Sequence, residues 1–330
     1  MPITSADTDP VALTLTVVAD FTAPVRRLWD AYLDPRQLER FWGPPGYPAT
    51  FTRHDGFAGG LSNYYMTSPE GEKFGGYWKW TAVDEGRGFE VLDGFANDDG
   101  TPNTEMPEGR MVFEFTETAL GSRVTCINHH DSLEDMEKVL AMGQVEGMKA
   151  AMGQMDDVLA DLASFAAGNA VEVQLIGENQ ARTSRIVRGT VEQVWRAHHD
   201  PELLRRWMLG PDGWTMPVCE VATEVGQRYR NGWRSEADGS EFGFTGEVLE
   251  ISAPHRSVTT EAMWTPDDPE AANSPSTLNE LTLTPVEGGT LVAALITYPD
   301  AATREMILAT GMSDGMETSY ARLESEVLAA

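Results

Sequence analysis

Two pairs of neighbouring residues in this chain could supply acid–base chemistry. His54 stands beside Asp55, and Cys219 stands beside Glu220 at a nearly equivalent place in the second half of the chain. A histidine next to a carboxylate can serve as a general base. Both pairs, however, end alternating runs that predict strands, and adjacent residues of a strand point to opposite faces of the sheet. We therefore expect neither pair to act as a unit.

Two histidine pairs, His129-His130 and His198-His199, could bind a metal ion. A zinc site takes three or four protein ligands, and no third ligand stands at a recognisable spacing from either pair. The sequence also has no G-x-S-x-G motif, no phosphate-binding glycine loop and no H-E-x-x-H motif. We expect no metal and no organic cofactor, and the motifs identify no catalytic residue.

Two matching strands with mixed side chains offer candidates for binding a small molecule. After Gly59-Gly60, Tyr64 and Met66 fall on one face of a predicted strand, and Asn231 and Trp233 hold the matching places in the second half. Apolar side chains with a few hydrogen-bonding groups are typical of ligand pockets, although the pattern also fits an ordinary core. The candidate ligand-binding residues are Tyr64, Met66, Trp78, Met148, Met152, Tyr229, Asn231, Trp233, Met312 and Met316.

A duplicated set of elements must position these residues. The phrase at residues 25–31, followed by Asp34-Pro35, recurs at residues 191–197, followed by Asp200-Pro201. The offset is 195 − 29 = 166 between the tryptophans of the two phrases and 315 − 147 = 168 between two later glycines. Such a repeat has to be identified before any local pattern is interpreted. We expect two domains, 1–167 and 168–330, each long enough to bury its own core.

Each copy has the pattern of a strand, two short helices, about six strands and a closing helix. Asp34-Pro35 begins a second short helix that we expect to end at Phe41-Trp42. Regularly spaced turn clusters between residues 47 and 131 predict about six antiparallel strands. Apolar residues at helical spacing predict one long closing helix over residues 132–165 and another over about 300–328. Residues 171–179 are either a linker or an added strand.

Two further expectations concern packing. Trp29 and Trp195 fall on the apolar face of the first helix of each copy, so we expect both to be buried anchors of the core. Glycines inside the closing helices each cost about 1 kcal/mol against alanine, so they indicate close packing or room for a ligand, and we expect close packing. These glycines are Gly143, Gly147, Gly153, Gly311 and Gly315.

The composition excludes several classes of partner. The chain has 52 acidic against 24 basic residues, a formal net charge of −28, which disfavours binding to nucleic acid or to anionic lipid. Cys126 and Cys219 fall at non-equivalent places in the two copies, so we expect buried thiols rather than a disulfide framework. No apolar run is long enough to span a membrane and no signal peptide is evident, so we expect a cytoplasmic protein.

The order of elements and several short motifs resemble one protein family. In the second copy, residues 246–251, 254–256 and 260–261 look like the strand-turn-strand signature of proteins similar to the C-terminal domain of the activator of the heat-shock-protein-90 ATPase. This family belongs to the SRPBCC (START-like, Bet v 1-like) superfamily. The resemblance implies an α+β fold of two tandem helix-grip domains, each an antiparallel sheet wrapped around a long C-terminal helix. The space between sheet and helix can then form a cavity.

Three functions remain open at this point. The first is non-catalytic binding of an apolar or amphipathic small molecule in that cavity. The second is an enzyme similar to polyketide cyclases and aromatases, in which Tyr64, His54 or Arg230 would direct proton transfers. The third is an adaptor that binds a chaperone through its surface, as the family name implies. Fold analogy alone does not separate these functions.

Overall fold

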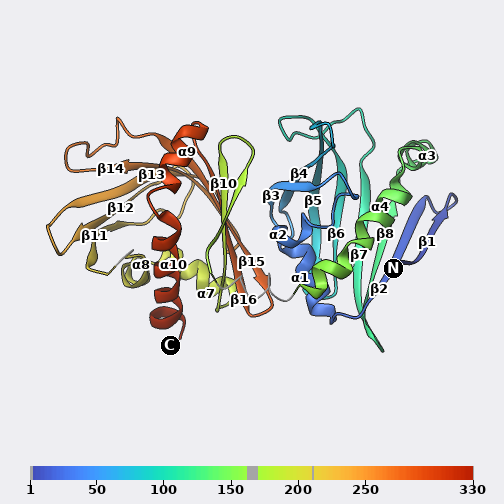
Figure 1. Cartoon of the computed structure of the whole chain (residues 1–330), viewed down its shortest axis with the longest axis horizontal. Coiled ribbons are helices and arrows are strands. Elements are labelled where there is room, and N and C mark those ends of the chain that lie inside the picture. Colours follow the sequence, from blue (N-terminus) through green and yellow to red (C-terminus); the bar gives the residue numbers. More distant parts are fainter. Residues whose placement is uncertain (1–2, 162–169, 210–211, 330) are drawn as a thin grey trace. The chain divides into compact units, whose positions relative to one another are not determined.

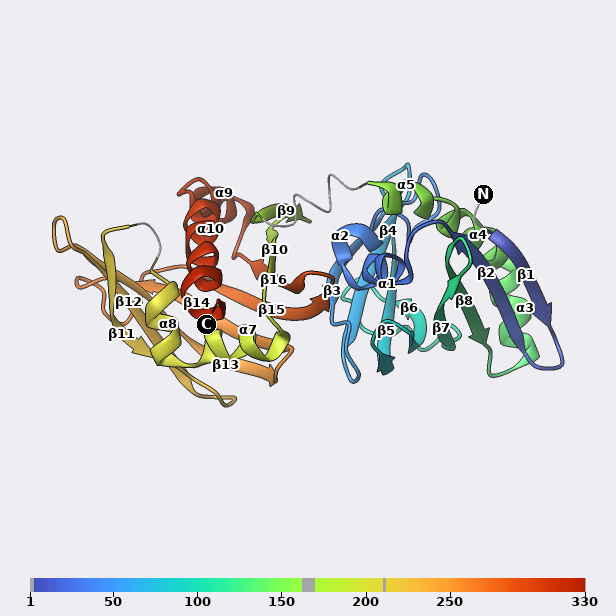
Figure 2. The same cartoon turned by 90° about the horizontal axis from the view of Figure 1, so that it is seen from below.

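The computed structural model describes residues 3–161, 170–209 and 212–329. The chain forms two compact units, Met1–Phe165 and Ala166–Ala330. Each unit contains one eight-stranded antiparallel sheet, with its helices on one side of that sheet (Figures 1 and 2). The duplication in the sequence is therefore a duplication of the fold. The expected boundary between residues 167 and 168 lies outside the described residues.

In the first unit the strands lie in the order β1-β2-β8-β7-β6-β5-β4-β3. Their bounds are β1 Ile3–Asp9, β2 Thr14–Phe21, β3 Ala49–His54, β4 Leu61–Thr67, β5 Lys73–Asp84, β6 Gly88–Ala96, β7 Gly109–Thr118 and β8 Gly121–His129. Six of them, β3 to β8, confirm the prediction for residues 47–131. The edge strand β1 was not predicted, because its polar sequence ITSADTD has no buried face and its pairing with β2 is a tertiary contact.

In the second unit the order is β11-β12-β13-β14-β15-β16-β10-β9. The bounds are β9 Glu172–Ile176, β10 Gln180–Val187, β11 Trp214–Glu220, β12 Arg228–Ser235, β13 Glu241–Ser252, β14 Arg256–Trp264, β15 Ser276–Val286 and β16 Gly289–Thr297. The stretch 171–179 therefore contains a strand, β9, which pairs with β10, and is not a linker. This strand is not an addition to the second unit, because β1 of the first unit pairs with β2 in the same way.

Two short helices follow the first long strand of each unit. In the first unit they are α1 Val25–Leu33 and α2 Pro35–Leu38, and in the second α7 Val191–His199 and α8 Pro201–Trp207. The Asp-Pro phrase starts α2 and α8, because the aspartate accepts a backbone hydrogen bond at the cap and proline fits the first turn. α2 ends at Leu38, before the predicted end at Phe41-Trp42.

The prediction of one long closing helix in each unit is wrong. The closing segment of the first unit is α3 Leu133–Ala141, α4 Gln144–Gly153 and α5 Met155–Ala160; that of the second is α9 Ala301–Leu308, α10 Met312–Arg322 and the π-helical turn η2 Leu323–Leu328. Gly143 and Gly311, 311 − 143 = 168 residues apart, have φ angles of 89° and 81°. A left-handed residue cannot continue an α-helix, and glycine adopts this conformation without steric cost.

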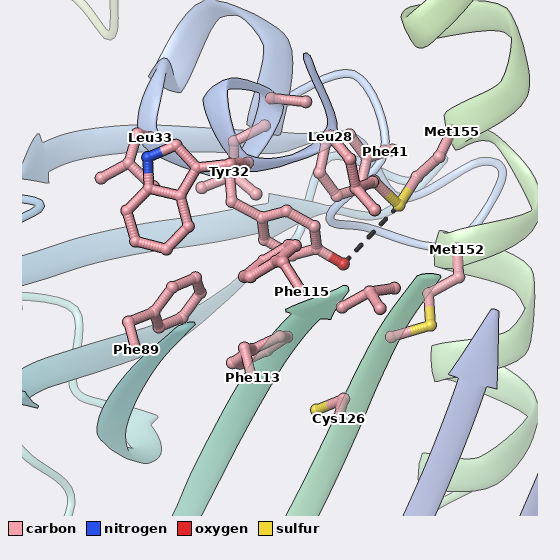
Figure 3. Packing of buried hydrophobic residues seen from close by; sticks show 14 of the residues in the cluster. Leu28, Tyr32, Leu33, Phe41, Phe89, Phe113, Phe115, Cys126, Met152 and Met155 are labelled. Atoms are coloured by element: carbon pink, nitrogen blue, oxygen red, sulfur yellow. Dashed lines mark hydrogen bonds between the residues drawn. The ribbon is translucent and has the colours of Figure 1, made fainter. Parts of the chain in front are cut away.

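The first unit holds its closing helices by apolar contact. Figure 3 shows Met152 and Met155 of the closing segment facing the aromatic side chains that β7 and α1 contribute, and the hydroxyl of Tyr32 lies 3.6 Å from the sulfur of Met155. Trp29 is 1% exposed in this core, as expected. Its counterpart Trp195 packs against the core of the second unit and stacks on His199, but it is only partly buried, so the expectation of full burial holds for Trp29 alone.

The second unit adds an ion-pair network at the same interface. Arg185 of β10 points toward α10 and is buried, and its guanidinium lies 3.1 Å from a carboxylate oxygen of Glu317 and 3.1 Å from one of Glu324. Two carboxylates thus compensate one buried arginine, which is the condition under which a buried charge is tolerated. In the second unit, ion pairs therefore join the sheet and the closing segment in addition to apolar contacts, whereas the contact described for the first unit is apolar.

Glycines of the closing helices face free space rather than a close neighbour. Gly147 lies one turn from Ala151, which is buried in the core, and Gly315 lies one turn from the buried Ser319. A Cβ atom at Gly147, Gly153 or Gly315 would have no other atom within 4 Å. The expectation of close packing at these glycines is wrong.

The two halves should fold independently. Expressed separately, residues 1–167 and 168–330 should each unfold cooperatively on heating, since each contains a whole sheet and its closing helices. Circular dichroism melts and amide NMR spectra of both fragments test this. A flat melt with poorly dispersed amide signals for either fragment would show that the copies share a core.

Two neighbouring glycines should respond to alanine in opposite directions. Gly147→Ala should raise the free energy of unfolding by about 0.5–1 kcal/mol, because alanine favours a helix and the new methyl group meets no atom. Gly143→Ala should lower it by about 1–2 kcal/mol, because the left-handed backbone would then carry a side chain. Urea denaturation measures both, and a loss of stability in Gly147→Ala would contradict the free space assigned there.

Candidate functional site

Each unit carries a carboxyl group on the face of its sheet that packs against the helices. On β6, Phe89 and Val91 point into the core, and the next residue on that face is Asp93. The corresponding strand of the second unit, β14, has Glu261 at the same place, 261 − 93 = 168 residues later. We did not single out either carboxyl as a site from the sequence. The sequence nevertheless contains a signal for them. Each is an acidic residue on the apolar side of an alternating strand, and the second follows the first at the offset of the duplication.

Matching bulges confirm that the two acids are equivalent. The pairing of β5 with β6 shifts after Trp80, and the pairing of β13 with β14 shifts after Val248, again 248 − 80 = 168 residues later. Two residues before its bulge, each strand places a residue opposite the acid: Trp78 opposite Asp93 in the first unit, and Gly246 opposite Glu261 in the second.

In the first unit an indole donates a hydrogen bond to the acid, and a phenol lies near it. Nε1 of Trp78 lies 2.9 Å from Oδ1 of Asp93, and the hydroxyl of Tyr64 is close enough to this carboxyl group to lower its pKa. Burial raises the pKa of Asp93 to about 7, above its usual range, and the negative charge of nearby Glu108 acts in the same direction. Burial and Asp93 likewise raise the pKa of Tyr64, so its hydroxyl stays protonated.

In the second unit the donor is a tyrosine, and an amide lies near the acid. The hydroxyl of Tyr229 lies 3.1 Å from Oε2 of Glu261, and the side chain of Asn279 is close enough to that carboxyl group to lower its pKa. Burial raises the pKa of Glu261, and burial together with the carboxylate raises the pKa of Tyr229. Both units therefore keep an acid of raised pKa among neutral hydrogen-bond donors.

The large aromatic side chain beside the acid comes from a different strand in each unit. Ser62 of β4 faces Trp78 of β5, whereas at the matching cross-strand pair Tyr229 of β12 faces Gly246 of β13. Small and large residues have thus changed places. A Cβ atom at Gly246 would lie 2.9 Å from Cε1 of Tyr229 and would overlap the Thr260 carbonyl, so only glycine fits under this tyrosine.

The structure brings three of the sequence candidates to these acids: Tyr64, Trp78 and Tyr229. Met66 lies on the same strand face as Tyr64 and packs against the core. Met148 places its sulfur 3.4 Å from Nδ2 of Asn128 on β8. Tyr64, Met66 and Met148 of the first unit thus lie between the sheet and α4.

The remaining candidates have other neighbours. Met152 is buried in the core of the first unit. Trp233 is buried and donates through Nε1 to the carbonyl of Met208, while Oδ1 of Asn231 has no hydrogen-bond partner among the described residues. Met316 packs against the main core of the second unit, but Met312 belongs to a separate cluster beside α9.

The histidines have structural partners. His54 lies 3.0 Å from Oγ of Ser62 and 3.1 Å from the carbonyl of Tyr32, while Asp55 forms an ion pair with Arg53. Burial lowers the pKa of His198 to about 4. Within the residues that the structure describes there is no group of three or more His, Cys, Asp or Glu side chains suited to a metal ion. In the same residues, no helix is long and apolar enough to cross a membrane.

Comparison with known proteins identifies a family match in both units. A sequence profile of the family described as "Activator of Hsp90 ATPase homolog 1-like protein" matches residues 22–160 and again residues 188–327. No curated protein matches the chain. The crystal structure of protein Ms6760 from Mycobacterium smegmatis is 48% identical, covers 48% of this chain and 98% of its own, and has a TM-score of 0.46. A solution structure of a protein from Arthrobacter aurescens is 41% identical, covers 48% and 92%, and has a TM-score of 0.46.

The raised pKa of Asp93 should make stability depend on pH. An aspartate has a pKa of about 3.9 in an unfolded chain, so the folded state holds this proton more tightly. The stabilisation is complete below about pH 4 and is lost as the pH rises through about 7. The free energy of unfolding of the wild type should therefore fall relative to that of Asp93→Asn across this range. Urea denaturation at several pH values tests this, with Glu114→Gln as an exposed control, and parallel pH profiles for wild type and Asp93→Asn would refute it.

Proposed function

This chain belongs, in both of its units, to the family of Activator of Hsp90 ATPase homolog 1-like proteins, and we propose that each unit binds an amphipathic small molecule between its sheet and its closing helix. The observation that carries the proposal is the acid that recurs on the helix-facing side of both sheets. One polar group in apolar surroundings orients a ligand, and the surroundings supply the contact area. Each acid here has aromatic side chains beside it.

Incomplete burial around the acid of the first unit supports this location. Asp93, Tyr64, Met66 and Met148 all point between sheet and helix, yet each remains partly exposed. Deeper in the same interface, Leu28, Phe113 and Cys126 are fully buried, which accounts for the stability of the unit. The interface is therefore fully buried at its centre and partly exposed near the acid.

The second unit has the same combination. Phe244, Met316 and Glu261 face the region between sheet and helix and remain partly exposed. Oδ1 of Asn231, which has no partner among the described residues, adds an unused hydrogen-bond acceptor on this face. Buried polar atoms normally have partners, so a bound polar group would complete this site.

An enzyme remains the second candidate, because each unit has a polar pair in which a tyrosine lies beside an acid of raised pKa. Such a pair can donate a proton or a hydrogen bond to a substrate. Binding is favoured because His54, the histidine considered as a separate base, is held by Ser62 and by the carbonyl of Tyr32. Incubation with candidate carbonyl substrates, followed by mass spectrometry of the products, distinguishes turnover from binding.

Surface association with a chaperone has weaker support. An adaptor needs a contiguous exposed apolar patch. The most exposed large apolar side chains of the described residues lie on separate loops, strands and helices of both units. They include Val11, Phe74, Leu120, Met142, Leu175, Val225 and Met306. The proposal therefore places the ligand inside each unit.

An apolar fluorescent probe should bind the wild-type protein saturably and quench its tryptophan emission, with Trp233 contributing in the second unit. Met316→Trp should block binding there while the fold survives, because filling an existing space costs less than overpacking a closed core. The matched control is Met306→Trp, which adds the same side chain on the exposed surface of α9. Fluorescence titration measures binding, and circular dichroism checks the fold.

Two results would refute the proposed site. One is the absence of saturable binding across a panel of apolar probes. The other is unfolding of the second unit in Met316→Trp, because the closing helix would then rest directly on the sheet.

A further inference from the structure

We infer that the site of each unit selects a cation: an amphipathic amine whose ammonium group pairs with Asp93 in the first unit and with Glu261 in the second. The inference rests on the proposed function, because it names the class of molecule that the same site takes. It follows from how this chain treats its other buried acids.

Elsewhere in the first unit each fully buried acid has an arginine beside it. Asp30, Asp34 and Asp55 are between 0% and 2% exposed. Arginine nitrogens lie 3.1 Å, 2.7 Å and 2.6 Å from their carboxylate oxygens, contributed respectively by Arg26, Arg36 and Arg53. Removing a carboxylate from water costs several kcal/mol, and a paired guanidinium offsets that cost. Arginine is thus the means by which this fold keeps a buried acid charged.

The two acids of the proposed sites lack such a partner. Among the described residues no lysine or arginine pairs with Asp93 or Glu261, and the hydrogen bonds to these acids come from the indole of Trp78 and the phenol of Tyr229. Neutral donors stabilise a carboxylate but leave its charge uncompensated. Since both acids are also partly exposed, a proton, water or a cation from outside can compensate each charge. The same arrangement in both units indicates that the missing cation is part of the site.

The groups around Asp93 favour a positive ligand. Tyr64 and Cys126 face it from β4 and β8 and stay neutral, because burial raises the pKa of each. Glu108 adds a negative charge nearby and is itself paired with Lys79, whose Nζ lies 2.8 Å from its Oε2. On the facing helix α4 the charged residues Glu146 and Lys149 pair with one another. The positive groups near Asp93 in the described part of the chain thus have carboxylate partners of their own, and the net charge of −28 attracts cations to the protein as a whole.

The same surroundings define the rest of the ligand. The ring centroids of Trp42 and Trp78 lie 4.5 Å apart, and those of Tyr64 and Trp78 lie 6.2 Å apart. These rings contact one another, so an ammonium group does not fit between them. The cation would lie beside this ring cluster, where the ring faces add a further attraction. Met66 and Met148 offer apolar surface for a hydrocarbon part. A bare metal ion fits poorly, because each site supplies one carboxyl group.

The test compares three probes that differ only in their head group. Octylamine, octanol and octanoate are titrated against the full-length protein carrying a bound apolar fluorescent probe, at about pH 8, where Asp93 is ionised. Octylamine should displace the probe at a concentration about tenfold lower than octanol, because only its ammonium group forms a charge-assisted hydrogen bond with the carboxylate. Octanoate should bind most weakly. At about pH 5.5 Asp93 is protonated, so the advantage of octylamine should shrink in the first unit.

Variants assign the effect to the two acids. In the double variant Asp93→Asn, Glu261→Gln, octylamine should lose its advantage while octanol binds as before. Glu114→Gln, which removes an exposed acid of β7, should leave the advantage unchanged. The pH comparison needs no variant, so the inference can be tested even if the double variant fails to fold.

The outcomes separate this inference from the proposed function. The preference for a cation is refuted if octylamine and octanol displace the probe equally well from the wild type. It is also refuted if the advantage of octylamine persists in the folded double variant. Either result leaves the proposed binding of a small molecule intact. If the apolar fluorescent probe shows no saturable binding to the wild type, and no binding of octylamine, octanol or octanoate is detected either, the proposed function fails together with this inference.

Discussion

The contact between sheet and closing helix is the constraint on which both units depend. A curved sheet with one apolar face has to bury that face, and in each unit the helix that follows the last strand covers it. The first unit makes this contact with methionine sulfur and aromatic rings. The second adds the pairing of Arg185 with Glu317 and Glu324. The candidate sites lie where this coverage is incomplete, so binding uses surface that folding leaves unburied.

The local part of the fold could be predicted from the sequence. The turn clusters gave the right number of strands between residues 47 and 131, and the Asp-Pro phrase marked the start of α2 and α8, because both signals depend on neighbouring residues. The edge strand β1 could not be found in this way, since its pairing with β2 alone defines it. The break at Gly143 was missed because an apolar period of three and four continues across a single left-handed residue.

The candidate site was predicted only in part. Tyr64, Trp78 and Tyr229 were singled out as mixed or aromatic side chains on strands, and the structure places all three against an acid. The acids themselves were passed over, because a single carboxylate in a strand is ordinarily solvated. Their role depends on which face they occupy and on the absence of a basic neighbour among the described residues. Both are properties of tertiary structure.

The exchange of small and large residues across one strand pair restricts how the two copies can have diverged. Ser62 with Trp78 and Tyr229 with Gly246 fill the same space in opposite ways. A route between them through tyrosine and tryptophan together would force two large side chains into one volume, whereas a route through serine and glycine leaves a hole that costs stability but no strain. The substitutions at this pair are therefore interdependent, and the order in which they accumulate matters. The intermediate without strain is an ancestor with two small residues at this pair, which is less stable and has a larger space between sheet and helix. Such an ancestor would have had the space to accept a new ligand.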